Sequence, residues 1–224
     1  MKILAYHSIG NKVAEVGAEL YCVPETAFRE QMKYTRNLGT VPYGDRPLIT
    51  FDDGDMTNYT KAYPILKELG MKAHFFIIGE WIGAPGYMGW REIAELKSGG
   101  MTIGSHGMTH RLLTTLKNEE LDYELRESKK ILEDNLNIPI TSLSIPRGFY
   151  NKKVMDRAKA AGYDQVFTSK ERIVVRADWD MEQFVDIFNG KYSWRQRAWD
   201  YVKSSSRNLL GDENYDKLRT KVLR

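Results

Sequence analysis

Two adjacent carboxylates are the first feature of this 224-residue sequence that suggests chemistry. Asp52 and Asp53 directly follow the apolar run from Pro47 to Phe51, which predicts a strand. Neighbouring carboxylates at the end of a buried strand repel each other and resist burial unless a cation or a proton relieves them. The alternative is a solvated turn, since Asp-Asp-Gly is a good turn sequence. The pair is therefore a candidate for metal binding or acid–base chemistry.

A second polar group lies in the segment from Ser105 to His110, where His106 and His110 stand four residues apart. Imidazoles at this spacing can share one side of a helical turn and offer two nitrogens to zinc at about 2.0 to 2.1 Å. An isolated pair can equally place one histidine at a strand end and one on the surface. However, the chain has 4 histidines, and two of them fall here. Two histidines with one aspartate form a common open catalytic metal site.

The other two histidines receive different predictions. His7 ends the apolar strand expected at residues 2–6, where it is either a third candidate for chemistry or a hydrogen-bonded structural residue. His74 lies inside the strand expected at residues 72–77. There we expect a packed core histidine with its hydrogen bonds satisfied, and we assign it no chemistry.

Short apolar strands alternate with longer helices along the chain, which is typical of repeated βα units around a parallel sheet or barrel. His7, Asp52, His106 and Arg147 each follow a predicted strand, at the edge where ligands gather in such folds. The sequence therefore directs side chains from four strands toward one edge. We predict strands at 2–6, 47–51, 72–77, 101–104, 141–145 and 164–168, and helices from 24 onward and at 57–69, 90–98, 118–136 and 151–161.

Composition excludes several classes of function. Lys and Arg number 33 against 30 acidic residues, so the net charge of +3 makes nucleic acid a poor partner. The single cysteine excludes an intramolecular disulfide and a metal site made of several thiolates. No apolar run approaches the roughly 20 residues of a transmembrane helix. The N-terminus becomes polar too early for a signal peptide, so we expect a cytoplasmic protein, or an extracellular or cell-surface one if a leader was removed.

The length fits one domain, and no linker or repeat divides the chain. We therefore predict a single domain over 1–224, with residues 190–224 as a C-terminal helical extension. That stretch carries aromatic residues among Arg and Lys, and we expect it to pack these rings on the barrel. The alternative is peripheral contact with an anionic membrane surface.

Three successive motifs resemble those of the polysaccharide deacetylases, the NodB-like carbohydrate esterases of family 4. The resemblance covers about Met1 to Phe184 and implies an irregular, TIM-like (β/α) barrel. Members typically hold a divalent metal with the second aspartate of the first motif and both histidines of the second, which implies Asp53, His106 and His110. The first aspartate acts as general base, which implies Asp52. The motifs are Thr50-Phe51-Asp52-Asp53-Gly54, Ser105-His106-x-x-x-His110 and Ile145-Pro146-Arg147-Gly148-Phe149-Tyr150-Asn151.

The sequence departs from the family pattern at two places. Many relatives carry a catalytic histidine on a late strand, and no histidine follows His110. Circularly permuted relatives, similar to the deacetylases of poly-N-acetylglucosamine, instead begin with a strand like Ile3 to His7, so His7 is expected to supply the acid. Relatives often place an arginine before a Pro-Tyr-Gly turn, whereas Arg147 follows the proline here. We expect Arg147 to pair with Asp52 and keep it ionised, the alternative being a surface residue in the turn.

The resemblance implies a metal-dependent hydrolase that removes N-acetyl groups from a saccharide containing N-acetylhexosamine. One divalent ion, zinc first with cobalt, nickel or iron also suitable, would lower the pKa of its water and polarise the acetyl carbonyl. Asp52 would take the water proton, and His7 would donate one to the leaving nitrogen.

Two alternatives stay open at this point. Asp53-Gly54-Asp55 also spells the Asp-x-Asp signature of a metal-dependent glycosyltransferase, although that reading gives His106 and His110 no role. The other alternative is a non-catalytic relative that keeps the barrel and binds carbohydrate without turnover.

Overall fold

The computed structural model describes residues 2–10, 21–38, 46–168, 172–175 and 181. The chain forms two compact units, Met1–Trp179 and Asp180–Arg224, and the elements below belong to the first. The helical extension predicted at 190–224, with its alternative of membrane contact, lies outside the described residues. Within the described part, every helix is too short or too polar to cross a bilayer.

Seven parallel strands form one sheet in the order β8-β7-β6-β5-β4-β1-β9, a nearly closed barrel. The (β/α) barrel expected from the sequence is thereby confirmed, and each of the six predicted strands is present within one or two residues of its predicted ends. The strands are β1 (Ile3–Tyr6), β4 (Leu48–Phe51), β5 (His74–Ile77), β6 (Thr102–Ser105), β7 (Ser142–Ser144), β8 (Gln165–Phe167) and β9 (Arg172–Val174).

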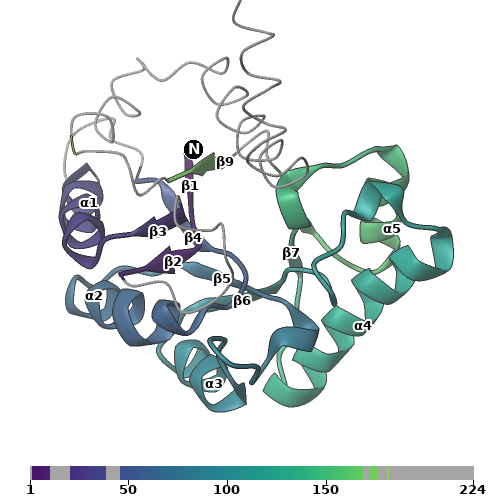
Figure 1. The fold of residues 1–224 in the computed structure, drawn as a ribbon, viewed down its shortest axis with the longest axis horizontal. Coiled ribbons are helices and arrows are strands. Elements are labelled where there is room, and N and C mark those ends of the chain that lie inside the picture. The colour runs from purple at the N-terminus through teal and green to yellow at the C-terminus, as the bar shows by residue number, and fades with distance from the viewer. Residues whose placement is uncertain (1, 11–20, 39–45, 169–171, 176–180, 182–224) are drawn as a thin grey trace, which may run out of the picture. The chain divides into compact units, whose positions relative to one another are not determined.

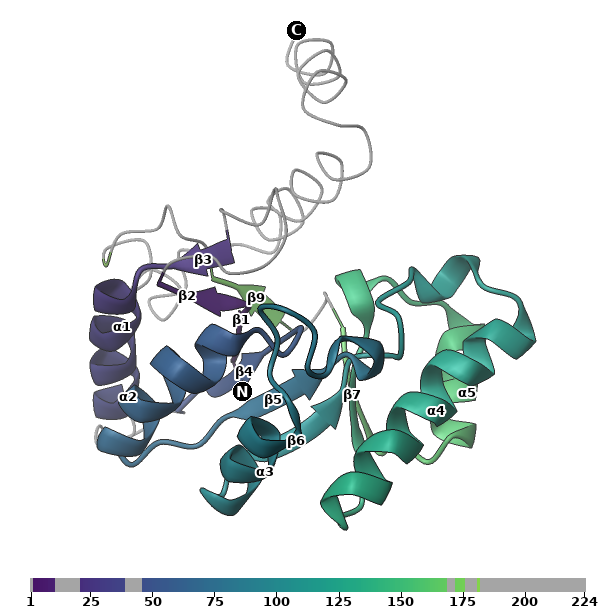
Figure 2. The same ribbon diagram turned by 60° about the horizontal axis from the view of Figure 1, so that its bottom comes forward.

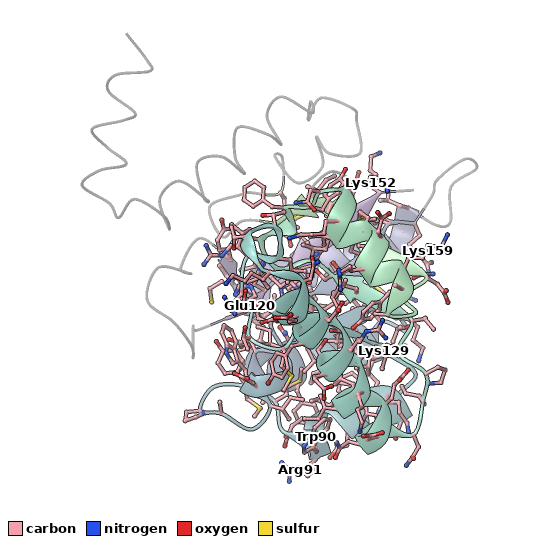
Figure 3. All side chains as sticks on the ribbon, turned by 90° about the vertical axis from the view of Figure 1, so that its right-hand side faces the viewer. Trp90, Arg91, Glu120, Lys129, Lys152 and Lys159 are labelled. Atoms are coloured by element: carbon pink, nitrogen blue, oxygen red, sulfur yellow. The ribbon has the colours of Figure 1, made fainter. Side chains whose placement is uncertain are left out.

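Helices follow the strands and cover the outside of the barrel, from α1 through α2 and α3 to α4 and α5 (Figures 1 and 2). Figure 3 looks onto α4 and α5, which lie side by side, with Lys129 on one and Lys152 and Lys159 on the other. The α-helices are α1 (Glu25–Leu38), α2 (Tyr63–Glu68), α3 (Trp90–Ser98), α4 (Asn118–Leu136) and α5 (Lys152–Ala160), and short 3₁₀ helices span Gly79–Trp81, Leu113–Thr115 and Pro146–Gly148.

The helix predicted at 57–69 is irregular in its first half. A π-helical turn at Asn58–Ala62 precedes α2, and the backbone N–H of Tyr63 donates to the carbonyl of Asn58, five residues back. Pro64 stands at the start of α2 and has no N–H to donate, which interrupts the regular ladder at this point. The turn places the buried side chain of Asn58 beneath the Asp52–Asp53 loop, where its amide donates to the carbonyl of Asp52.

Three strands were not predicted. β2 (Ser8–Ile9) and β3 (Cys22–Val23) form a separate parallel pair, and each is only two residues long. β9 adds an edge to the barrel beside β1, with Ile3 and Arg172 in register. Two or three residues are too few for an alternating pattern to be distinguished from loop sequence.

Aromatic rings pack between helix α1 and the strands β1, β4 and β5, on the outer face of the barrel. The rings of Phe51 and Phe75 stack with centroids 4.8 Å apart, and Tyr6 and Phe28 pack on the same group. All four side chains are fully buried. This buried cluster fixes β4, the strand that Asp52 follows, so the candidate site stands on a well-packed part of the core.

His74 packs as predicted, against the rings of Phe76 and Phe167. Its hydrogen bonding differs from the expectation, because the buried Nδ1 atom has no hydrogen-bond partner. Burial lowers the pKa of the His74 imidazole, so the ring stays neutral among its aromatic neighbours.

Truncating Phe75 to alanine is expected to cost about 3 to 5 kcal/mol of unfolding free energy, because a buried ring is replaced by a cavity. Urea unfolding followed by circular dichroism measures this. The matched control is Tyr150→Ala, since that ring is 40% exposed. Its loss is expected to change stability by no more than about 0.5 kcal/mol. Equal losses in the two variants would contradict the core assignment.

Candidate active site

Asp53, His106 and His110 meet at the C-terminal edge of the barrel. Each offers one ligand atom, and the three atoms lie within 4.8 Å of one another. The Oδ1 atom of Asp53 lies 3.3 Å from Nε2 of His106 and 3.6 Å from Nε2 of His110. This buried oxygen has no hydrogen-bond partner. A carboxylate oxygen facing two imidazole nitrogens without a partner is the arrangement that a divalent cation fits.

The backbone carbonyl of Ser144 orients His106. The Nδ1 atom of His106 lies 2.8 Å from that carbonyl, so Nδ1–H donates to it and the lone pair of Nε2 faces Asp53, where a cation can accept it. Metal-ligating histidines are commonly fixed in this way by a backbone or carboxylate oxygen. Because Ser144 ends β7 and His106 follows β6, pairing of these two strands sets the direction of the imidazole.

Two of the three candidate ligands have left-handed backbone conformations. Asp53 has φ 71° and His110 has φ 61°, which costs a residue with a side chain on the order of 1 kcal/mol or more. Such conformations persist only where the surrounding structure enforces them. Both side chains are thereby turned toward the same point above the barrel.

Glu124 of α4 holds the loop that carries the two histidines. Its buried carboxylate accepts hydrogen bonds from the backbone N–H groups of Met108 and Thr109, at 2.7 and 2.9 Å, and from the Thr109 hydroxyl. Gly107 has φ +78°, and an added Cβ there would lie 3.0 Å from Oε2 of Glu124. No direct signal for this role is present in the sequence, because Glu124 belongs to a helix otherwise rich in surface charge.

Asp52 is bound by Arg172 rather than by Arg147. The Nη2 atom of Arg172 donates to Oδ1 of Asp52 at 2.8 Å, and both side chains are almost fully buried. Arg172 also donates to the hydroxyls of Ser144 and Thr50, and the Ser144 hydroxyl donates to Oδ2 of Asp52 at 3.2 Å. The carboxylate is therefore ionised inside the barrel and held by side chains of two other strands, β9 and β7.

Arg172 reaches this position from the opposite end of the barrel. It is in register with Ile3, the first residue of β1, whereas Asp52 follows the last residue of β4. Its guanidinium extends through the interior and lies 5.7 Å from the ring centre of Phe76. Arg172 stands at the start of its strand, whereas the predicted site residues follow theirs. The sequence does contain one indication of this strand, the β-branched run Ile173-Val174-Val175. That run predicts a short strand with Arg172 at its start.

Arg147 is exposed on the 3₁₀ turn after β7 and has φ 60°. Its charge contributes to lowering the pKa of His110, which places it at the rim of the site. In the described part of the chain no ion pair joins Arg147 to Asp52. The expected pairing is thus made by a different arginine.

His7 follows β1, next to the strand that ends in Asp52, and the N–H of Asp52 donates to the carbonyl of Tyr6. The His7 ring is partly buried and lies 5.1 Å from the ring of Tyr21, and its Nδ1 has no hydrogen-bond partner. Its charge contributes to lowering the pKa of Asp53. His7 therefore lies near the carboxylate pair.

Burial and the local charges set the protonation of the group. Burial raises the pKa of Asp52, but the charges of Arg172 and His106 outweigh it and leave the pKa below its usual value. The pKa of Asp53 is likewise lowered by the neighbouring histidines against the effect of burial. Burial lowers the pKa of His110 to about 4, which leaves the imidazole neutral near pH 7. Ionised carboxylate and neutral imidazole are the forms that bind metal.

Asp55 does not join the candidate ligands. Its buried Oδ1 accepts hydrogen bonds from the backbone N–H and the hydroxyl of Thr57, at 2.8 and 2.5 Å. The Thr57 hydroxyl in turn accepts from the N–H of Ile9 in β2. Asp55 is thus part of the turn that ties β2 to the loop, which gives no support to a glycosyltransferase Asp-x-Asp site.

Comparison with known proteins agrees with this geometry. A family model described as polysaccharide deacetylase matches residues 41–166, more than half of the chain. The chain belongs to the polysaccharide deacetylase family. A putative polysaccharide deacetylase of Bacillus subtilis is 32% identical over 188 residues, which cover 76% of this chain and 64% of the relative. A poly-β-1,6-N-acetyl-D-glucosamine N-deacetylase of Staphylococcus aureus is 30% identical over 142 residues, which cover 56% of this chain and 48% of the relative.

The structural comparison agrees with the family assignment. The crystal structure of a polysaccharide deacetylase from Bacillus cereus superposes with a TM-score of 0.72 at 24% identity, over 83% of this chain and 67% of that one. At this identity the likeness shows the fold. The chain spans 64% of the Bacillus subtilis relative and 48% of the Staphylococcus aureus relative.

Replacing Arg172 by methionine is expected to cost about 3 to 5 kcal/mol of unfolding free energy, because it leaves the buried Asp52 carboxylate without its counter-charge. Adding Asp52→Asn to Arg172→Met is expected to recover part of that loss. Arg147→Met, at an exposed position, is the control and should change stability by no more than about 0.5 kcal/mol. Denaturant unfolding of Arg172→Met, Asp52→Asn, the double variant and Arg147→Met decides. Additive losses for Arg172 and Asp52 would mean that the two side chains are not coupled.

Glu124→Gln is expected to weaken zinc binding about tenfold, because an amide cannot accept all three hydrogen bonds that hold the histidine loop. The measurement is isothermal titration of the metal-free protein with zinc. Glu127→Gln, on the exposed side of the same helix, is the matched control. Unchanged zinc affinity in Glu124→Gln would remove Glu124 from the support of the site.

Proposed function

We propose that this protein is a metal-dependent hydrolase that removes N-acetyl groups from a saccharide containing N-acetylhexosamine. The observation that carries the proposal is the Asp53, His106 and His110 cluster, whose buried carboxylate oxygen faces two imidazoles next to an arginine-paired Asp52. Membership of the polysaccharide deacetylase family supports the reaction class. Relatives named as deacetylases of peptidoglycan N-acetylglucosamine and of poly-β-1,6-N-acetyl-D-glucosamine support the kind of substrate.

Asp53, His106 and His110 would hold the metal. Two nitrogens and one oxygen suit zinc first, with cobalt, nickel or iron also compatible. When bound, the divalent ion supplies Lewis acidity, which lowers the pKa of water and polarises the acetyl carbonyl. The protein fixes the direction of the ligands in two ways. The Ser144 carbonyl orients His106, and the Glu124 carboxylate holds the backbone of the histidine loop.

Asp52 would act as the general base. Its Oδ2 atom lies 3.9 Å from Nε2 of His106, on the side of the candidate ligands, while Oδ1 is bound by Arg172. The charge of Arg172 keeps the carboxylate ionised at neutral pH, and the Ser144 hydroxyl restricts its rotation. A base held in this way can take a proton from water beside the ligands without first losing one of its own.

His7 would be the general acid. Amide hydrolysis needs a proton for the departing amine, and His7 is the histidine near the carboxylates that is not part of the ligand set. Its ring has an unpartnered Nδ1 atom, and its strand is fixed to the Asp52 loop by the bond from the N–H of Asp52 to the carbonyl of Tyr6. Protonated His7 would donate to the sugar nitrogen as the C–N bond breaks.

Zinc is expected to stabilise the folded protein through this site. At a free zinc concentration of about 100 times the dissociation constant, the gain is about 2.7 kcal/mol. Thermal unfolding with and without zinc measures it, and His110→Ala is expected to abolish the shift. Asp134→Asn, at an exposed position of α4, is expected to keep it. A full zinc-dependent shift in His110→Ala would place the metal elsewhere.

Incubation with tetra-N-acetylchitotetraose and zinc is expected to release acetate, which an enzyme-coupled assay measures. Asp53→Asn should reduce the rate about a hundredfold or more, because it removes a charged ligand. The exposed Asp134→Asn serves again as control. Acetate release that survives in Asp53→Asn, or that is absent from the parent protein with all four candidate metals, would contradict the proposal.

A further inference from the structure

His7 lies between two strands, and the backbone on both sides determines where its ring stands. The Nδ1 atom of the imidazole has no hydrogen-bond partner. Before His7, β1 is fixed to the carboxylate loop by the bond from the N–H of Asp52 to the carbonyl of Tyr6. After His7, β2 begins at once with Ser8. The position of the ring therefore also depends on how β2 is fixed relative to that loop.

A threonine hydroxyl fixes β2. The N–H of Ile9 donates to Oγ1 of Thr57 at 2.9 Å. The same hydroxyl donates to Oδ1 of Asp55 at 2.5 Å, and the N–H of Thr57 donates to that oxygen at 2.8 Å. All three residues are buried. Because the hydroxyl accepts one hydrogen bond and donates another, its orientation is fixed, and it holds β2 in one place.

Asp55 belongs to the loop that carries both carboxylates of the site. The N–H of Asn58 donates to the carbonyl of Asp55, and the Asn58 amide donates to the carbonyl of Asp52. The strand β2 lies beside this π-helical turn (Figure 1). The hydrogen bonds that run from Ile9 through Thr57 to Asp55 thus connect the segment after His7 to the carboxylate loop.

We infer that Thr57 is a positioning residue that keeps His7 within reach of the substrate nitrogen. This inference rests on the proposed function and deepens it, because it assigns control of the proton-donating step to a residue outside the ligand set. A general acid must lie within hydrogen-bond distance of the atom that it protonates, and a misplacement of about 1 Å can cost about a hundredfold in rate. Without the Thr57 hydroxyl, the buried N–H of Ile9 loses its partner, and the segment after His7 shifts.

The leaving group separates this role from general support of the fold. In amide hydrolysis, water adds its oxygen to the acetyl carbon and gives a proton to Asp52, and the proton of His7 passes to the nitrogen as the C–N bond breaks. The p-nitrophenolate leaving group of p-nitrophenyl acetate is a weak base and departs without a proton. Misplacement of His7 therefore slows hydrolysis of the amide and spares the ester.

The kinetic test compares Thr57→Val, Thr57→Ser and Thr60→Val in the zinc-loaded protein. Thr60 belongs to the same π-helical turn, but its hydroxyl is exposed and donates to the carbonyl of Met56, which makes Thr60→Val the matched control. Thr57→Val is expected to lower kcat for tetra-N-acetylchitotetraose about tenfold. Its KM for the tetramer, its zinc affinity and its kcat for p-nitrophenyl acetate should change by less than about twofold.

The other variants locate the effect. Thr57→Ser keeps the hydroxyl, so it should match the parent with both substrates, as should Thr60→Val. In a His7→Ala background, Thr57→Val is expected to cause no further loss of kcat with the tetramer, because the group that it positions is already absent.

A second measurement follows His7 without any substrate. In NMR spectra of the histidine rings of the metal-free protein, the resonance that is missing from His7→Ala identifies His7. Its chemical shift depends on the ring of Tyr21, whose centre lies 5.1 Å away. The shift is therefore expected to change in Thr57→Val and to stay at the parent value in Thr57→Ser and Thr60→Val.

Four outcomes would overturn the inference. They are an unchanged kcat for the tetramer in Thr57→Val, an equal loss with the ester, a tetramer defect that persists in the His7→Ala background, and an unchanged His7 resonance in Thr57→Val. Failure of the proposed function is distinguishable, because the parent would then release no acetate from the tetramer, whereas the His7 resonance and its dependence on Thr57 would still be measured.

Discussion

Two adjacent carboxylates, Asp52 and Asp53, stand at the end of a buried strand, and each faces a different set of partners. Arg172 reaches Asp52 through the barrel interior, and the two imidazoles of His106 and His110 face Asp53. Removing a charge from water is costly unless it is paired, so neither carboxylate tolerates loss of its partner. Under the proposed function this division gives the neighbours different roles: Asp52 would accept a proton, and Asp53 would bind the cation.

The rest of the fold follows from keeping those partners in place. Parallel strands bring His7, Asp52 and His106 to one edge, and β9 brings Arg172 in from the other end. Helix α4 lies outside the barrel, yet its Glu124 carboxylate controls the histidine loop. Asp53 and His110 have left-handed backbone conformations, which residues with a side chain disfavour. The surrounding structure must therefore hold these two residues in place. The positions of the site side chains therefore depend on the loops, on helix α4 and on the barrel strands together.

The strand pattern predicted the barrel and brought the Asp52–Asp53 pair and the two histidines to one edge, and the family resemblance then implied Asp53, His106 and His110 as the ligand group. Strand ends in a parallel fold share an edge, so residues that follow strands can be placed without coordinates. This rule does not find Arg172, because its long side chain reaches Asp52 from the far end of the barrel. The rule favours Arg147 as the partner of Asp52 instead, because Arg147 follows a strand. Glu124 escaped it because a buried carboxylate on an amphipathic helix looks like any surface glutamate. The role of His7 as acid stays a prediction, as does the identity of the metal.

The most direct measurement is anomalous X-ray diffraction at the zinc edge from crystals of the zinc-loaded protein. One peak is expected at about 2.0 to 2.2 Å from an Asp53 oxygen and from Nε2 of both His106 and His110, with Asp52 still bound to Arg172. A peak held by other residues, or zinc-loaded crystals in which these three side chains point apart without a peak between them, would contradict the account.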